Sequence, residues 1–325
     1  MKKILQIEAV VLAVVLLIAV LVATGIFRPS QPDPTEPATE PTAPTTEPTE
    51  PVVIIPTWNT YPADRQIKAK QYFVYDTKAD TFLVTSSQQL ERVYPASVTK
   101  LFTAYVALQY LEPKQKITVD NVLDLIAAGS SVAGIRQGDT LTVERLVEAM
   151  LLPSGNDAAY ILACEAGRVM KNNPQMYGYH AVRAFVEEMN AQAKALGMVA
   201  THFVNPDGIH SQEHYSTFGD LAIMGKLALA NPIVMQYAAT AKDQIYLHGV
   251  VIDWKNTNSL INPDSDYYCP YAVGLKTGQT PSAGSCLLSA FRVGGRELII
   301  GVFGSPTGND RFDDTLQLFN QIVLN

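Results

Sequence analysis

A serine and a lysine three positions apart are the first residues whose spacing could support chemistry. Residues 97–100 read Ser-Val-Thr-Lys and follow a proline at position 95. A proline at this point is typical of a helix start, so Ser97 is expected in the first turn. Residues i and i+3 share a helix face, which lets the Lys100 amine reach the Ser97 hydroxyl. A serine becomes a strong nucleophile when a neighbouring base accepts its proton, and Lys100 can be that base if its pKa is lowered. Alone, the pair is equally compatible with a surface lysine.

A second motif, Ser154-Gly155-Asn156, follows Pro153, where one helix is expected to end. It places a serine hydroxyl and an asparagine amide on the turn before the next helix. The alternative interpretation is a helix N-cap, which Ser, Asn and the following Asp157 all favour.

A third motif, Lys276-Thr277-Gly278, ends an apolar strand that starts at residue 271. A glycine without a Cβ lets a ligand lie close to the strand edge, where backbone groups can pair with it. An ammonium group beside a hydroxyl suits a carboxylate. The three motifs therefore offer a nucleophile, a base and a possible anion site.

The elements that must position these motifs follow a simple order. Alternating apolar residues predict strands near both ends of the working part of the chain, with helices between them. Strands are expected over residues 71–76, 81–85, 273–277, 285–292 and 298–304. Helices are expected from about 97 (with Leu101, Ala104, Tyr105, Leu108 and Leu111 on one face), over 143–152, 181–196 and 220–229, and at the end over 312–323. This order predicts an α/β (α+β) fold, with one antiparallel sheet from both chain ends, covered by helices, and a helical lobe from the middle.

Composition narrows the class of protein. The chain has 325 residues, 47% of them hydrophobic, and a net charge of −7. It can build a core, and its acidic balance argues against nucleic-acid binding. Three cysteines cannot form a disulfide framework. Cys269 and Cys286 flank the third motif, so a disulfide between them is conceivable, although free thiols are favoured.

The N-terminal region predicts export. Lys2 and Lys3 precede an apolar run over residues 9–27, which is long enough to span a bilayer. Positive charge before the run sends the remainder across the membrane. An uncleaved anchor is favoured over a cleaved signal peptide, for which residues 23–25 offer a site. We therefore predict three parts: an anchor or signal (1–28), a disordered Pro/Thr/Glu linker (29–62) and a catalytic domain (63–325).

Taken together, the ordered motifs S-x-x-K, S-x-N and K-T-G resemble one family. They and their flanks, at 95–105, 152–159, 201–208, 214–217 and 274–284, are similar to the serine-type D-alanyl-D-alanine carboxypeptidases, the low-molecular-mass penicillin-binding proteins. The resemblance runs from about residue 65 to the C-terminus. It implies a β-lactamase/DD-peptidase-like fold and a hydrolase that removes terminal D-alanine from peptidoglycan stem peptides. It also implies covalent binding of β-lactams, with neither a metal nor another cofactor.

The resemblance assigns roles to the first two motifs. Ser97 would be the acylated nucleophile and Lys100 its general base. Ser154 would relay a proton to the departing D-alanine, assisted by Lys276. Asn156 would hold the peptide backbone of the substrate.

The remaining implied roles concern the carboxylate end of the substrate. Lys276 and Thr277, with Gly278 beside them, would receive the terminal carboxylate. The backbone N–H groups of Ser97 and Gln279 would form the oxyanion hole. Arg311 falls where some relatives have a further arginine near the carboxylate. A surface pair with Asp313 or Asp314 is the other interpretation of Arg311.

Several alternatives remain open at this point. A D,D-endopeptidase would use the same residues on peptidoglycan crosslinks, and a non-catalytic β-lactam- or peptidoglycan-sensing domain would bind without turnover. A β-lactamase is disfavoured because no E-x-x-L-N stretch lies between Asn156 and Lys276. Penicillin is therefore expected to leave Ser97 slowly. His210 and His214 invite a zinc site, but Pro206 and Gly208 predict a loop there, and the family mechanism uses no metal.

The resemblance also implies a location. The catalytic domain would face the cell wall from the outer side of the bacterial membrane, or would be released to the wall if the signal is cleaved. Relatives often carry a β-rich domain after the catalytic one, and no such domain is expected here. The N-terminal anchor would replace the C-terminal membrane helix of other members.

Overall fold

The computed structural model describes residues 66–86 and 91–323. The predicted anchor or signal (1–28) and linker (29–62) lie outside the described residues, so these segments and their boundaries stay predictions. Within the described part, no single helix is long and apolar enough to cross a membrane. One pair, α6 (Phe218–Ala230) and α7 (Pro232–Ala238), passes that test only jointly and is bent by 97°.

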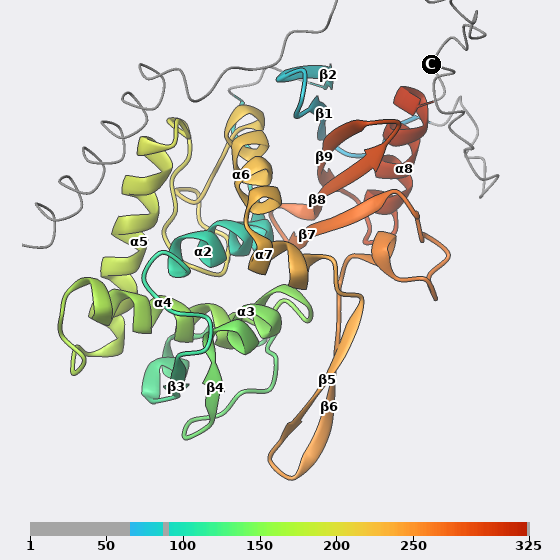
Figure 1. Cartoon of the computed structure of the whole chain (residues 1–325). Helices are drawn as coiled ribbons and strands as arrows, with labels where there is room; N and C mark the ends of the chain where they lie inside the picture. The colour runs from blue at the N-terminus through green and yellow to red at the C-terminus, as the bar shows by residue number, and fades with distance from the viewer. Residues whose placement is uncertain (1–65, 87–90, 324–325) are drawn as a thin grey trace, which may run out of the picture. The chain divides into compact units, whose positions relative to one another are not determined.

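One five-stranded antiparallel sheet forms the centre of the fold (Figure 1). Its strand order is β2-β1-β9-β8-β7. The strands are β1 (Gln71–Asp76), β2 (Thr81–Thr85), β7 (Ala272–Thr280), β8 (Gly284–Val293) and β9 (Arg296–Ser305). Pairing of β1 with β9 joins the two ends of the described chain, since Phe73 lies opposite Gly301. The predicted fold class, a sheet built from both ends, is confirmed.

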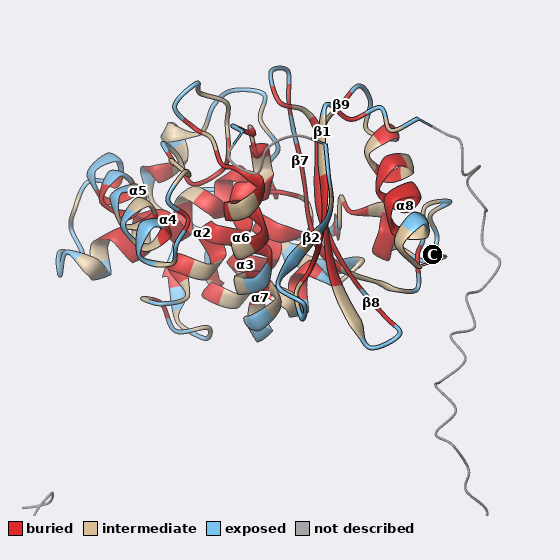
Figure 2. Ribbon diagram, turned by 90° about the horizontal axis from the view of Figure 1, so that it is seen from above, coloured by how far each residue is buried: buried red, intermediate tan, exposed pale blue. Residues whose placement is uncertain are grey.

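Both faces of the sheet are covered, as Figure 2 shows with the sheet seen edge-on. Helix α8 (Asp310–Val323) packs on one face, where Val74 and Phe291 belong to the same core cluster as Phe319. Phe73, the neighbour of Val74, points to the opposite face and joins the core of the helical lobe. Side chains alternate between the faces of a strand, so double coverage makes the central strands almost continuously buried.

The helical lobe contains the elements that carry two of the three motifs. Its helices are α2 (Thr99–Ala107), α3 (Val143–Leu151), α4 (Asn156–Met170), α5 (Gly178–Ala195), α6 and α7, with short 3-10 turns η1 (Ala96–Val98) and η2 (Asn121–Leu125). A third 3-10 turn, η3 (Ser259–Ile261), packs through Leu260 in the core cluster on the α8 side of the sheet. Two small two-stranded sheets belong to this part of the fold: β3 (Lys116–Thr118) pairs with β4 (Thr140–Thr142) across a long connection, and β5 (Lys242–Leu247) forms a hairpin with β6 (Val250–Lys255).

The predicted elements agree with these bounds to within a few residues, with one correction. The helix that starts after Ser97 ends at Ala107, so Leu108 and Leu111 lie beyond it rather than on its face. The chain turns there, and the Leu111 N–H donates to the carbonyl of Ala107. Leu111 is nevertheless buried, which explains its apolar character.

Candidate active site

A cleft of about 590 Å³ lies between the sheet edge at β7 and the helical lobe. All three motifs contribute to its walls, as do residues from several loops and helix α8. The lining residues are Ser97, Ala127, Ala128, Gly129, Ser130, Ser131, Pro153, Ser154, Asn156, Gly208, Ile209, Thr257, Thr277, Gly278, Gln279, Thr280, Pro281 and Arg311. The fold therefore brings residues more than 200 positions apart into one site.

Ser97 lies in the turn η1, and Lys100 lies in the first turn of α2. Lys100 Nζ is 2.8 Å from Ser97 Oγ, 2.7 Å from Asn156 Oδ1 and 2.8 Å from the Asp207 carbonyl oxygen. Lys100 is fully buried, and burial lowers its pKa to about 8 against the opposing charges of Asp207 and Asp157. A buried amine with this pKa, in contact with a serine hydroxyl, is suited to accept its proton.

Ser154 adopts a left-handed backbone conformation, with φ of +64°, and lines the cleft. The alternative interpretation of this motif as a helix cap is wrong: the N-cap of α4 is Gly155, without a side-chain cap. Ser131 holds the strained turn, because its hydroxyl donates to the Ser154 carbonyl at 2.8 Å and its carbonyl accepts the Asn156 N–H at 2.9 Å. Strained non-glycine residues concentrate at functional sites.

Lys276 lies on β7, and its fully buried side chain contacts Thr257 and Thr277, which line the cleft. Its Nζ donates to Thr257 Oγ1 at 3.1 Å and to Thr277 Oγ1 at 3.5 Å. Burial, together with the positive charges of Lys100 and Arg311, holds the Lys276 pKa well below its ordinary value. Arg311 therefore supplies positive charge at this end of the cleft, and burial favours the neutral form of the Lys276 amine.

The structure shows a second reason for a glycine at position 278, besides the predicted close approach of a ligand to the strand. A Cβ at this position would lie 2.8 Å from the Pro95 carbonyl oxygen and 2.9 Å from the Ser97 nitrogen. The missing side chain thus lets β7 pack against the turn that carries the nucleophile. Gln279 follows on the strand and lines the cleft together with Ser97, so both predicted oxyanion-hole residues lie at one site.

Arg311 is the second residue of α8 and points to the cleft. Its Nη1 donates to the Gly278 carbonyl at 3.1 Å, and its buried Nε has no hydrogen-bond partner within the described residues. The alternative interpretation as a surface pair with Asp313 or Asp314 is therefore wrong. The guanidinium lies where an anion could complete its contacts.

Two residues of the site were missed by the sequence interpretation. Thr257 shares a hydrogen bond of 2.5 Å with Thr277 through their hydroxyl oxygens and accepts from Lys276. Asp207 is buried beside Lys100 and supplies one of its acceptors. Thr257 has no local signal, because its partners lie about 20 positions away. Asp207 lies within the stretch 201–208 that resembles the family, but its contact with Lys100 joins residues 107 positions apart and could not be predicted from spacing.

The segment that follows the cleft-lining residues 127–131 is held by a buried carboxylate. Asp157 accepts the N–H groups of Ala133, Gly134 and Ile135 at 2.9 to 3.1 Å. On the other side of the loop, the Trp254 indole donates to the Ala133 carbonyl at 2.9 Å. The hairpin β5–β6, which carries Trp254, thereby supports the substrate cleft from outside.

The histidines and cysteines considered in the sequence have other positions. His214 pairs with the Thr99 hydroxyl at 2.9 Å, and His210 packs against the edge of Tyr94. The described residues contain no group of three or more potential ligands placed to hold a metal ion. Cys269 and Cys286 are buried free thiols, and burial raises their pKa values to about 12 and about 11.

Comparison with known proteins places this site in a family. Residues 58–307 match the family model described as D-alanyl-D-alanine carboxypeptidase. The D-alanyl-D-alanine carboxypeptidase of Streptomyces sp. K15 is 33% identical over 234 residues, which cover 69% of this chain and 77% of that protein. The carboxypeptidase DacF of Bacillus subtilis is 30% identical over 226 residues, which cover 68% of this chain and 54% of that protein. The aligned part thus spans only about half of the Bacillus protein.

Solved structures give the same result. The Streptomyces K15 DD-transpeptidase is similar with a TM-score of 0.71 and 30% identity, over 80% of this chain and 99% of that one. Penicillin-binding protein D2 of Listeria monocytogenes, solved in its cefotaxime-bound form, has a TM-score of 0.64 and 27% identity, over 79% and 98% of the two chains. The sequence comparison and the comparison of folds therefore identify the same group of proteins as similar to this chain.

Proposed function

The chain belongs to the D-alanyl-D-alanine carboxypeptidase family, and we propose that it is a serine carboxypeptidase that removes the terminal D-alanine from peptidoglycan stem peptides. The observation that carries this proposal is the 2.8 Å contact between the buried Lys100 amine and the Ser97 hydroxyl, at the floor of a cleft with a positive end. A nucleophile beside a lowered-pKa base and a carboxylate site are the parts that this reaction needs.

Acylation follows from the geometry. The neutral Lys100 amine takes the Ser97 proton as Ser97 Oγ forms a bond to the carbonyl carbon of the penultimate D-alanine. The resulting oxyanion lies near the backbone N–H groups of Ser97 and Gln279. The C–N bond then breaks, and the proton that Lys100 took from Ser97 passes through the Ser154 hydroxyl to the leaving amine of D-alanine, which leaves Lys100 neutral again. The terminal carboxylate is held by Thr277 and Arg311.

Deacylation requires a water molecule to attack the ester on Ser97, and Lys100 can accept its proton in turn. Among the described residues that line the cleft, none is an aspartate or a glutamate. A dedicated carboxylate for activating water is thus missing from the wall of the cleft, which supports slow hydrolysis of a bulky penicilloyl ester. The protein is proposed to be inhibited covalently by β-lactams rather than to destroy them.

The test is release of D-alanine by the full chain from a synthetic peptide that ends in D-Ala-D-Ala. Release that disappears in Ser97→Ala supports the proposal. Acylation by benzylpenicillin without peptide turnover would instead support the sensing domain. Cleavage of crosslinked muropeptides but not of the linear peptide would support the D,D-endopeptidase. Because the similar Streptomyces K15 protein is called a DD-transpeptidase, an amino acceptor added to the same assay shows whether this chain also transfers the acyl group.

We also propose that the catalytic domain faces the cell wall from the outer side of the membrane, held by residues 1–28 and the linker. The support is the sequence pattern: Lys2 and Lys3 before an apolar run, then a proline-rich acidic tract. Fractionation of expressing cells tests this proposal. Full-length protein in the membrane pellet supports the anchor, whereas a shortened protein in the medium supports a cleaved signal.

A further inference from the structure

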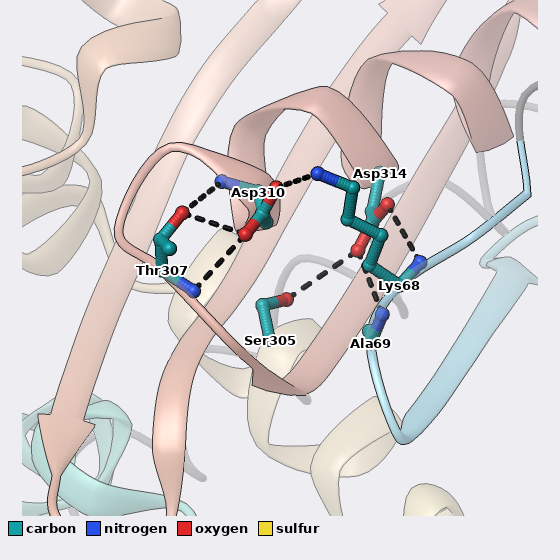
Figure 3. A network of polar contacts seen from close by, with 6 residues as sticks. All are labelled: Lys68, Ala69, Ser305, Thr307, Asp310 and Asp314. Atoms are coloured by element: carbon teal, nitrogen blue, oxygen red, sulfur yellow. Dashed lines mark hydrogen bonds and ion pairs between the residues drawn. The ribbon is translucent and has the colours of Figure 1, made fainter.

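The chain segment that leads into β1 lies against helix α8 (Figure 3). Arg311 belongs to the first turn of that helix. Lys68 Nζ donates to Asp310 Oδ1 at 2.5 Å. The carboxylate of Asp314 accepts the backbone N–H groups of Lys68 and Ala69 at 3.0 and 2.8 Å. Asp310 and Asp314 are four residues apart and share one face of the helix. The segment therefore contacts α8 at two points that are one turn apart.

Asp310 also takes part in capping the N-terminus of α8. The Thr307 hydroxyl oxygen accepts the Asp310 N–H at 3.2 Å, and Asp310 Oδ2 accepts the N–H and the hydroxyl of Thr307 at 3.1 and 2.6 Å. This reciprocal pattern is a capping box, which defines where the helix begins. One carboxylate thus joins the helix start to the Lys68 side chain, as the dashed lines of Figure 3 show.

Arg311 follows Asp310 directly and points about 100° away from it around the helix axis. The Asp310 side faces Lys68, whereas Arg311 reaches Gly278 on β7. Two fixed points on one face determine both the rotation and the axial position of the first turn. A rotation of that turn would carry the guanidinium away from the cleft, because its long side chain extends outward from the axis.

We propose that Lys68, through its ion pair with Asp310, is a positioning residue that holds Arg311 at the carboxylate end of the cleft. The inference rests on the proposed function, in which that end receives the terminal carboxylate. According to this proposal, the segment that leads into β1 contributes to substrate binding although it does not contact the substrate. The side-chain hydrogen bonds of Ser97 and Lys100 within the described residues go to one another, to Asn156 and to Asp207, and not to this segment, so we expect the effect to be confined to ligands that carry a carboxylate.

The test compares Lys68→Met with a matched control, Lys226→Met. Lys226 forms an ion pair with Asp80 at 2.6 Å, and the two lysine side chains are 46% and 43% exposed, whereas Asp310 is 8% and Asp80 69% exposed. Helix α6, which carries Lys226, lies on the opposite side of the sheet from α8 (Figure 2). Lys68→Arg serves as the conservative variant, since it keeps the charge.

Two reagents separate positioning from general damage. Benzylpenicillin carries a carboxylate, whereas an N-acyl-D-alanine p-nitrophenyl ester has a neutral nitrophenyl group where the peptide carries its terminal carboxylate. We expect Lys68→Met to slow acylation by benzylpenicillin about three- to fivefold, which is the loss that one part-exposed ion pair allows. Acylation by the ester should not change, Lys68→Arg should restore the rate, and Lys226→Met should behave like the unmodified protein. For the D-Ala-D-Ala peptide, KM should rise while kcat stays within about twofold.

Arg311→Leu provides the coupling test. In that background, Lys68→Met should have no further effect on the benzylpenicillin rate, because its effect passes through Arg311. Additive losses, or an equal loss with the ester, would overturn the inference. An unmodified protein that is acylated by benzylpenicillin but releases no D-alanine would contradict the proposed function alone. An unmodified protein that reacts with neither reagent would overturn both.

Discussion

The Nζ atom of Lys100 lies 2.8 Å from the carbonyl oxygen of Asp207, and the Asp207 carboxylate is buried with it. The Oδ1 atom of Asp207 accepts the Ile209 N–H at 3.2 Å, while the Oδ2 atom of Asp207 has no hydrogen-bond partner among the described residues. Burial raises the pKa of Asp207, and the charge of Lys100 lowers it. The base and this carboxylate therefore form an electrostatic pair at the nucleophile.

The pH dependence of acylation should report the pKa of Lys100. Since burial lowers that pKa to about 8, the neutral amine increases as the pH rises through this value. At pH 6 to 7 only about 1 to 10% of the amine is neutral, so kcat/KM should rise about tenfold per pH unit there and level off above pH 8 to 9. Initial rates of D-alanine release between pH 5.5 and 10 measure this profile. A flat profile from pH 6 to 9 would contradict the role of Lys100.

Substituting Asp207→Asn should move this profile to lower pH. The negative charge of Asp207 favours the protonated amine, so its removal lowers the pKa of Lys100 and raises the neutral fraction at pH 6. The asparagine side chain has nearly the same shape, and its oxygen can still accept the Ile209 N–H. The measurement is the acidic limb of kcat/KM for the two proteins. An unchanged limb, or one displaced upward, would show that the carboxylate does not act on Lys100.

Gly278→Ala should remove acylation while the protein stays folded. The added Cβ would lie within 3 Å of the backbone at Pro95 and Ser97, so the nucleophile turn or β7 must shift. A displacement of about 1 Å at a reacting group can cost about a hundredfold in rate. The matched control is Gly219→Ala, because a Cβ there meets nothing within 4 Å. Labelling by fluorescent penicillin and circular dichroism together measure the outcome, and normal labelling of Gly278→Ala would contradict it.

Glu148 makes stability depend on pH. It is buried on α3, and burial raises its pKa from 4.5 to about 7, although Arg145 contacts it. Between these two values the folded protein holds a proton that the unfolded chain has lost, so this group lowers the free energy of unfolding as the pH rises from 4.5 to 7. Glu148→Gln removes the effect. Relative to the unmodified protein, the variant should gain about 1 to 2 kcal/mol between pH 5 and pH 8.

Urea unfolding at pH 5 and pH 8 measures this difference for both proteins. Asp243, which also binds Arg145, keeps its carboxylate in the variant, and its pKa is lowered to about 2 mainly by the hydrogen bond with Glu148. A stability difference that is the same at both pH values would show that Glu148 is ionised in the folded protein throughout this range.

Much of the architecture could be predicted because local periodicity records which face is buried. The bounds of β1 and β2 agree with the prediction, and the three C-terminal strands and α8 differ only at their ends. The hairpin β5–β6 was missed, although the alternation in residues 242–247 and the turn at His248 and Gly249 are signals for it. Its contribution through Trp254 could not be predicted, because that contact joins segments 121 residues apart.

The sequence by itself determined the chemistry that is available: a serine with a lysine one turn later, a serine with an asparagine on a turn, and a lysine with a threonine at a strand end. Residue type and local spacing suffice for such motifs. Only the tertiary structure decided how deeply these residues are buried and which charged and polar groups surround them. It buries Lys100 and Lys276, places Asp207 and Thr257 against them, and attaches Lys68 to the helix that carries Arg311. A pKa and the direction of a side chain depend on charges and packing from distant segments, and these meet only when the chain is folded.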